Sequence, residues 1–263
     1  MRQLEIALVL LALTACVSTP VAPRRETGFL DRTVTVAGAT YRYQVYVPAA
    51  YDPARAWPVI LFLHGGGERG SDGMLQTEVG LGAAIRRFRE RYPAIVVMPQ
   101  APAGPADVPV SVWQDASDVA LGALDAALGE FSADAARVYL TGMSQGGHGS
   151  WYLAYHHPQR FAALVVICGW VAETGGRPGV LPAGTSSPYA AVAARLKHLP
   201  VWIFHGDADP VVPVEESRRI HHELQALGAA VHYTEFPGGN HNAWDPAYLS
   251  PELPAWLFAQ RKP

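Results

Sequence analysis

Short apolar runs recur along the chain at the length of a strand, and they predict a central sheet. Continuously apolar runs occupy residues 59–63, 95–98, 138–140, 163–168 and 201–204. Strands that are buried on both faces of a parallel sheet have this uninterrupted hydrophobic pattern. Residues 40–47 instead alternate apolar and polar side chains, which predicts a half-exposed strand near an edge of the sheet.

Helix-like stretches separate these runs. They occupy residues 117–131, 146–156 and 214–227, and a last strand at 231–236 precedes a closing helix at 251–260. Such an alternation is typical of a doubly wound α/β domain, in which helices cover both faces of a mostly parallel sheet. The 263 residues, 49% of them hydrophobic, are enough for one large domain with a sizeable core.

The N-terminal segment has the features of an export signal. Arg2 supplies a positive charge, residues 6–13 are apolar, and small residues precede Cys16. The apolar run is far shorter than the roughly 20 residues of a membrane-spanning helix. We therefore expect a signal peptide at residues 1–15, a tether at 16–30 and the α/β domain at 31–263.

The residues before Cys16 also resemble a bacterial lipobox. Leu13-Thr14-Ala15-Cys16 has its pattern, and the resemblance implies that Cys16 becomes the lipid-modified first residue of the mature protein. Val17, rather than an aspartate, follows Cys16, which in lipoproteins of Gram-negative bacteria implies the outer membrane. We expect a protein of the cell envelope whose only membrane contact is this anchor. An ordinary signal peptide that is cut nearby is the alternative.

Charge and cysteine content argue against several classes of partner. The formal net charge is -3, so no basic excess points to nucleic acid or to anionic lipid headgroups. Cys168 is the only cysteine besides Cys16, and its apolar surroundings favour a small buried hydrophobe over a nucleophile. The sequence has ten histidines but neither an H-E-x-x-H pattern nor paired cysteines, so we expect no metal and no cofactor.

A candidate nucleophile lies where a predicted strand meets a helix. The strand at residues 138–140 runs into Thr141-Gly142-Met143-Ser144-Gln145-Gly146-Gly147, and the helix follows at once. Strand, sharp turn and helix are the context that a G-x-S-x-G nucleophile elbow requires. Gly142 and Gly146 suit such an elbow because its strained turn leaves no room for side chains. Ser144 is therefore the predicted nucleophile.

Two more polar loops follow predicted strands, and parallel strands bring such loops to one edge of a sheet. The loop after residues 201–204 contains Asp207 and Asp209. We favour Asp209 as the carboxylate that orients a histidine, because its longer loop can reach the top of the sheet, and Asp207 as a brace of the turn. The last glycine-rich loop contains His241, which can act as general base and then as general acid. The order serine, aspartate, histidine is that of α/β-hydrolases.

Backbone amides are the expected donors to an oxyanion. One is the N–H of Gln145, at the start of the elbow helix, where the helix dipole adds a favourable potential. The other is expected in the glycine loop after residues 59–63, at Gly66 or, as the second choice, at Gly65. No Lys-Ser or Lys-Thr follows this loop, which argues against phosphate binding.

Together these motifs resemble a known group of enzymes. They are similar to bacterial carboxylesterases described as predicted peptidases or phospholipase/carboxylesterase-like enzymes, in the dienelactone-hydrolase, feruloyl-esterase and polyhydroxybutyrate-depolymerase branch of α/β-hydrolases. The similar segments are residues 61–70, 141–147, 205–213 and 241–244, within a similarity that covers about residues 41–260. The resemblance implies Ser144 as nucleophile, Asp209 as acid and His241 as base. Gln145 replaces a frequent methionine and Gly66 a frequent alanine, and neither change removes a backbone donor.

The expected activity is that of a serine esterase acting on small or aromatic-acyl carboxylic esters. Trp113, Trp170 and Trp244 lie in predicted loops near the active face, where they either line a substrate pocket or pack in the core. Two other functions stay open. One is a prolyl-oligopeptidase-like peptidase, although such enzymes usually carry a propeller domain. The other is a catalytically inactive binding lipoprotein, although all three triad positions are filled.

Overall fold

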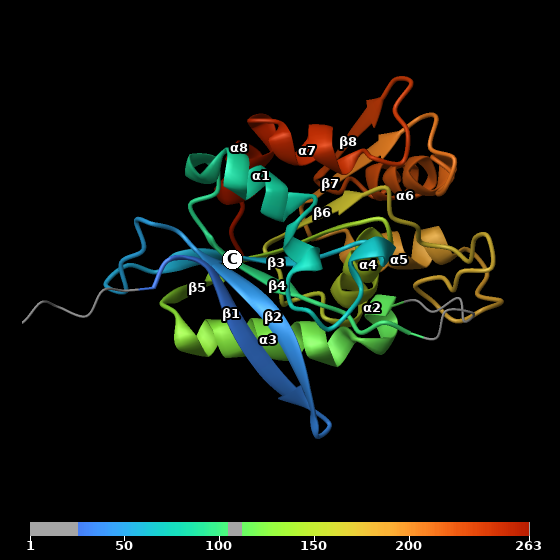
Figure 1. Cartoon of the computed structure of the whole chain (residues 1–263). Helices are drawn as coiled ribbons and strands as arrows, with labels where there is room; N and C mark the ends of the chain where they lie inside the picture. The colour runs from blue at the N-terminus through green and yellow to red at the C-terminus, as the bar shows by residue number, and fades with distance from the viewer. Residues whose placement is uncertain (1–25, 105–111, 263) are drawn as a thin grey trace, which may run out of the picture.

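An eight-stranded sheet forms the centre of the computed structural model, which describes residues 26–104 and 112–262 (Figure 1). The strands are β1 Gly28–Val36, β2 Ala39–Val47, β3 Trp57–Leu63, β4 Ile95–Pro99, β5 Ala133–Met143, β6 Ala163–Ile167, β7 Val201–Gly206 and β8 Val231–Phe236. Their order across the sheet is β1-β2-β4-β3-β5-β6-β7-β8. The last six pair in parallel, whereas β2 is antiparallel to both β1 and β4. The predicted mostly parallel sheet is confirmed.

Helices cover both faces of this sheet (Figure 1). One face carries α2 Val112–Asp115, α3 Ser117–Glu130, α4 Gln145–His156, α5 Pro188–Leu196 and α6 Glu215–Ala226, and the other carries α1 Leu81–Arg87, α7 Trp244–Leu249 and α8 Glu252–Ala259. The chain between β3 and β4 also forms the short 3-10 helices η1 Gly66–Glu68, η2 Leu75–Thr77 and η3 Arg89–Arg91. Within the described ranges, no helix combines the length and the apolar character needed to cross a membrane. The expected signal peptide and Cys16 lie outside these ranges.

The uninterrupted apolar runs have a simple explanation in these two helical layers. Successive side chains of a strand point to opposite faces of the sheet, so a strand that is covered on both faces needs an apolar residue at every position. In β3, Val59, Leu61 and Leu63 enter one core, and Ile60 and Phe62 enter the other. Every residue of β3 is buried. The strand therefore holds the loop that follows it in a fixed place.

The edge strand β1 was not predicted from the pattern of the sequence. It begins at Gly28, three residues before the expected domain boundary at residue 31. Asp31 and Arg32 interrupt its apolar alternation. In the structure both charges have partners, because Asp31 accepts a hydrogen bond of 2.6 Å from Gln44 and Arg32 pairs with Glu130 at 2.7 Å. β1 pairs with β2 along its whole length.

Two fully buried histidines tie loops to the core. His64, directly after β3, has a hydrogen bond of 2.6 Å from Nδ1 to the Gly65 carbonyl and accepts one of 3.0 Å at Nε2 from the Ala101 amide. His148 in α4 donates from Nδ1 to the Trp170 carbonyl at 3.0 Å and stacks on the Trp170 ring. Burial lowers the pKa of His64 and of His148 to about 4. Both rings are therefore neutral at pH 7.

These lowered pKa values predict a loss of stability in mild acid. An unfolded histidine titrates near pH 6.5, so at pH 5 both histidines are protonated in the unfolded chain. In the folded state, His64 and His148 remain mostly neutral at that pH. We expect the free energy of unfolding to fall by about 2 kcal/mol for each histidine between about pH 7 and pH 5. Urea denaturation at the two pH values measures it. Equal stability at both would contradict the assigned neutral state.

Helix α4 approaches β3 so closely that only glycine fits at the contact. A Cβ atom built on Gly146 would lie 1.9 Å from the carbonyl oxygen of Leu63 and 2.6 Å from that of His64. A Cβ on Gly142 would lie 2.2 Å from the carbonyl oxygen of Gly146. Because the neighbours are backbone atoms, they cannot move aside as a flexible side chain could. The start of α4 and the end of β3 are consequently held together.

Substitution of Gly146 tests this contact. In Gly146→Ala the new methyl group meets backbone oxygens, and we expect a loss of about 3 kcal/mol or more in the free energy of unfolding. The matched control is Gly129→Ala in α3, where a Cβ meets nothing within 4 Å and where alanine should stabilise the helix by about 0.5–1 kcal/mol. Urea denaturation of both variants measures the difference. A Gly146→Ala protein as stable as wild type would refute the close approach.

Candidate active site

Ser144 occupies a sharp turn between β5 and α4. β5 ends at Met143 and α4 begins at Gln145, so a single residue connects strand and helix. Its backbone has φ 54° and ψ −117°, a conformation that costs energy for a residue with a side chain. The Ser144 amide donates a hydrogen bond of 2.9 Å to the Ile167 carbonyl of β6, which helps to hold the turn. The strand, turn and helix predicted around Ser144 are all present.

The structure brings the three predicted triad residues together. The Oγ atom of Ser144 lies 2.9 Å from Nε2 of His241, and Nδ1 of His241 lies 2.7 Å from Oδ2 of Asp209. The carboxylate accepts the hydrogen on Nδ1, so Nε2 of the neutral ring faces the serine hydroxyl with its lone pair. The side chain of Asp209 is fully buried, whereas that of His241 is 18% exposed. The arrangement can therefore remove a proton from Ser144 at a place that a ligand can reach.

Asp209 is held as a carboxylate by four donors. Its Oδ1 atom accepts hydrogen bonds from the amides of Val211 and Val212, at 2.8 and 3.0 Å. Its Oδ2 atom lies 2.7 Å from His241 and 3.2 Å from Nε2 of His205. Burial acts to raise the pKa of Asp209, but hydrogen bonds from His205, His241 and the two amides hold it well below its usual range. An ionised Asp209 can orient His241 and stabilise its protonated form.

Asp207, the competing aspartate, has a different environment. It is exposed, and its Oδ1 atom accepts a hydrogen bond of 2.6 Å from the Gly238 amide. The Asp207 amide donates in turn to the Phe236 carbonyl at 3.2 Å. These bonds connect the loop after β7 to the loop after β8. Asp207 thus braces the two loops, as the sequence predicted, and it is Asp209 that contacts His241.

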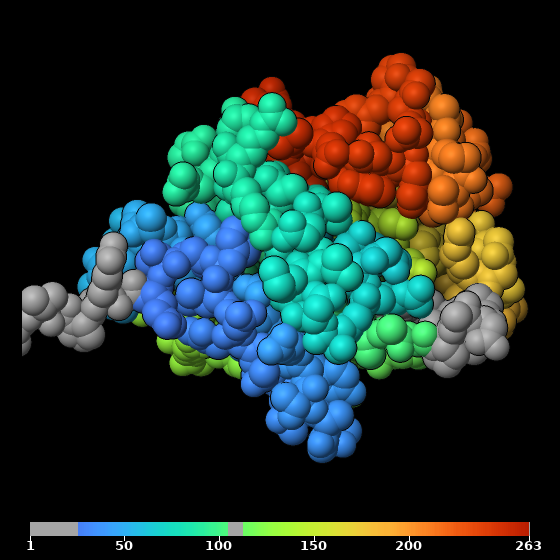
Figure 2. Space-filling view, viewed as in Figure 1, coloured from blue at the N-terminus to red at the C-terminus, as the bar shows by residue number. Residues whose placement is uncertain are grey.

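The glycine loop after β3 lies against the turn at Ser144. A Cβ on Gly65 would be 3.7 Å from Cβ of Ser144, and one on Gly66 would be 3.0 Å from Cδ of Gln145. The loop is fixed by His64 and by Nε of Arg69, which donates to the Gly66 carbonyl at 2.9 Å. The predicted oxyanion residues Gly65, Gly66 and Gln145 are therefore neighbours of the candidate nucleophile. In the space-filling view, the cyan segment after β3 and the red segment after β8 lie on the same face (Figure 2).

The three predicted pocket tryptophans have different places. Trp113 is fully buried, and its indole N–H donates to the His64 carbonyl at 2.9 Å. Trp170 is 2% exposed and donates to the Pro178 carbonyl at 2.9 Å. Both therefore pack in the core, which is the second of the two alternatives stated for them and not the pocket lining, and each indole N–H has a backbone carbonyl as its partner there. Trp244 is half-buried, and its ring centre lies 5.5 Å from that of His241, so it alone of the three borders the triad.

Two residues next to the triad were not recognised in the sequence as contacts of it. His205 touches Asp209, although its position directly after the apolar run 201–204 gave no sign of this. The thiol of Cys168 donates to the His241 carbonyl at 3.5 Å, and burial raises its pKa, which agrees with the predicted small buried residue. Among the described residues, ligand atoms of Cys168, Asp209 and His241 lie within 4.8 Å of one another. The facing atoms of Asp209 and His241 are already bonded to each other, so a metal would have to displace that bond.

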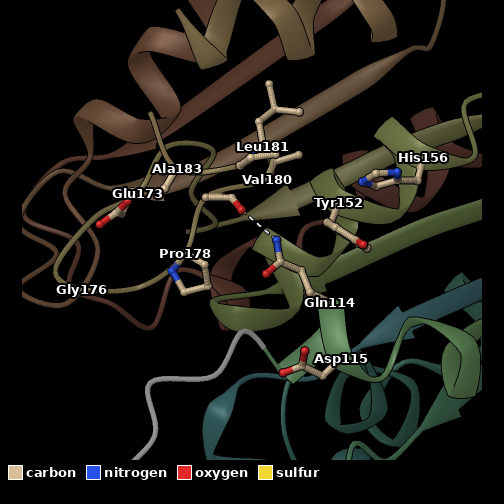
Figure 3. Close-up of a pocket in the computed structure, with 12 residues that line it drawn as sticks. Gln114, Asp115, Tyr152, His156, Glu173, Gly176, Pro178, Val180, Leu181 and Ala183 are labelled. Atoms are coloured by element: carbon tan, nitrogen blue, oxygen red, sulfur yellow. Dashed lines mark hydrogen bonds between the residues drawn. The ribbon is translucent and has the colours of Figure 1, made fainter. Parts of the chain in front are cut away.

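A groove of about 640 Å³ lies on a different part of the molecule (Figure 3). It is bounded by α2, by the C-terminal half of α4 and by residues 173–183. Tyr152 and His156, which line it, lie about 12 and 18 Å beyond Ser144 along the axis of α4. The groove is therefore separate from the triad. Its described lining includes neither His241 nor Asp209.

Solved structures with a similar fold include several esterases. A thermostable esterase is 31% identical, with a TM-score of 0.71, and the similarity covers 89% of this chain and 63% of that one. A CE1 ferulic acid esterase from the anaerobic fungus Anaeromyces mucronatus is 18% identical with a TM-score of 0.69, over 90% of this chain and 92% of that one. The expected α/β-hydrolase fold is confirmed.

Sequence comparison gives a family. An acyl-protein thioesterase 1 from Gibberella zeae is 28% identical over 127 residues, which are 48% of this chain and 49% of that protein. The chain spans no more than half the length of the curated relatives that it matches. The family model described as Putative esterase matches residues 35–256, a range that contains the turn at Ser144 and both of its partners. The chain belongs to the Putative esterase family.

Proposed function

We propose that the protein is a serine carboxylesterase whose catalytic residues are Ser144, His241 and Asp209. The observation that carries the proposal is the continuous hydrogen-bonded chain from the serine hydroxyl through the imidazole to a buried carboxylate. The family to which the chain belongs supports ester hydrolysis. A strained turn that exposes the serine and a histidine that is reachable from solvent are what acyl transfer to water requires.

The proposed reaction proceeds in two halves. His241 Nε2 takes the proton from Ser144 as Oγ attacks the carbonyl carbon of the ester. The amides of Gln145 and of Gly66, or of its neighbour Gly65, stabilise the negative oxygen of the tetrahedral intermediate. His241 then gives the proton to the leaving alcohol, and the acyl group stays on Ser144. Water, activated by His241 in the same way, releases the acid and restores the serine.

The substrate class that we propose is small or aromatic-acyl carboxylic esters. Trp244 supports it, because its half-buried ring beside His241 offers an aromatic surface next to the reacting atoms. Solved structures with the same fold include ferulic acid esterases, whose acyl group is aromatic. Rates on p-nitrophenyl acetate, feruloyl esters, acetylated sugars and peptide amides test this proposal. Turnover of amides without turnover of esters would replace it with the peptidase alternative.

Removal of the serine hydroxyl tests the nucleophile. Ser144→Ala should lower kcat for p-nitrophenyl acetate at least about 1,000-fold and abolish labelling by a fluorophosphonate, because no oxygen remains to be acylated. The control is Ser186→Ala, on an exposed loop, which should keep both properties. Equal labelling of wild type and Ser144→Ala would remove Ser144 from the mechanism.

The two aspartates make a matched pair. Asp209→Asn should lower kcat about 1,000- to 10,000-fold, since an amide in place of the carboxylate can neither fix the Nδ1–H form of His241 nor stabilise its charge. Asp207→Asn should change kcat less than about threefold, because an amide oxygen can still accept the hydrogen bond of the Gly238 amide. Steady-state kinetics of the two variants measure the contrast. If Asp207→Asn lost more activity than Asp209→Asn, the roles would have to be exchanged.

A further inference from the structure

His205 is a second histidine on the triad carboxylate. It lies near the end of β7, its side chain is fully buried, and Nε2 is 3.2 Å from Oδ2 of Asp209. The same Nε2 atom is 3.0 Å from the Val212 carbonyl. On the other side of the ring, Nδ1 is 2.7 Å from Oγ of Ser217 in α6. His205 therefore connects the sheet, α6 and both ends of the short segment 209–212.

The partners of His205 decide which nitrogen carries hydrogen. The Val212 carbonyl and the Asp209 carboxylate can only accept, so Nε2 must be the donor to both. Nδ1 of the neutral ring then accepts from the hydroxyl of Ser217. With the hydrogen on Nδ1 instead, Nε2 would bring a lone pair against a carboxylate and leave the Val212 carbonyl without this donor. Ser217 consequently favours the tautomer of His205 that can donate a hydrogen bond to Asp209.

We propose that His205 is a positioning residue that fixes Asp209 against His241, and that Ser217 selects the tautomer of His205 with hydrogen on Nε2. The inference rests on the proposed function, but the geometry is its own support. β7 is hydrogen bonded to a strand on each side, so the imidazole is attached to an internal strand of the sheet. Asp209 itself lies in a loop. Its contact with His205 restrains Oδ2, the carboxylate atom that also faces His241. His205 is not placed to touch substrate, because it is fully buried.

The charges around His205 predict the sign of a pH effect. Asp209 and His241 face it from the loops, and Glu235 lies opposite it on β8, where it is bonded to Arg218 of α6 and to the hydroxyl of Tyr233. On the side of β6 the titratable residue is Cys168, whose backbone amide donates to the Phe204 carbonyl at 2.8 Å. Loss of the His205 donor leaves the Asp209 carboxylate more negative toward His241. A proton on His241 is then held more strongly, and the acidic limb of activity moves to higher pH.

The test compares His205→Leu, which removes the donor, with His205→Gln, whose Nε2 amide can still donate. For His205→Leu we expect kcat to fall about 10- to 100-fold with KM nearly unchanged, and the acidic limb of kcat/KM to move to higher pH. His205→Gln should recover most of both. Ser217→Ala should change both in the same direction but less, and it covers the case in which His205→Leu does not fold. His222→Gln, on the exposed side of α6, is the control and should behave as wild type.

A measurement without turnover separates this inference from the proposed esterase. The low-field proton NMR resonance of His241 Nδ1–H reports its bond to Asp209 directly. It should move or broaden in His205→Leu and in Ser217→Ala and keep its wild-type position in His222→Gln. A wild type that hydrolyses no ester overturns the proposed function and leaves this readout intact. Folded variants with an unchanged resonance and an unchanged pH profile would show that His205 only packs.

Discussion

The contact between the start of α4 and the end of β3 is the constraint on which the candidate site depends. At Gly146 the helix backbone meets the carbonyl oxygens of Leu63 and His64 at a distance that admits no side chain. One consequence is the sharp turn at Ser144, since the chain must reverse within a single residue to enter the helix there. Another is that the glycine loop after β3 starts beside that turn. One packing contact between backbones thus places the proposed nucleophile next to its proposed oxyanion donors.

Neutral histidines do structural work at the carboxyl edge of the sheet. His64 and His148 each join a loop carbonyl to the core, and burial lowers the pKa of both rings. A neutral imidazole offers one donor and one acceptor, and in His64 these satisfy two loop groups at once without a buried charge. His205 also has a partner at each ring nitrogen, Asp209 on one side and Ser217 on the other. His241, which is partly exposed, is the histidine of the proposed triad.

The sequence was informative where one local rule decides the structure. Continuous apolar runs identified the buried parallel strands, and glycines around Ser144 identified the turn, because few other patterns satisfy two-sided burial or a backbone contact. The sequence was uninformative where the structure of a segment depends on partners that are distant in the chain. Asp31 of β1 is hydrogen bonded to Gln44 and Arg32 is paired with Glu130, and no local pattern reveals these partners. The short helices α1, α5 and α7 lack a long periodic stretch, and the buried states of Trp113 and Trp170 depend on carbonyls elsewhere in the chain.

The charged edge strand has a consequence for the behaviour of the protein in concentrated solution. A sheet that is open at its side offers unpaired backbone groups to any other strand, which is how native proteins begin to associate into fibres. β1 is such an edge, and Asp31, Thr33 and Thr35 project from it as exposed polar residues. A strand added beside β1 would remove the Asp31 carboxylate from water, which costs free energy. Asp31 and Arg32, which interrupt the apolar pattern of β1, would therefore oppose extension of the sheet by a neighbouring molecule.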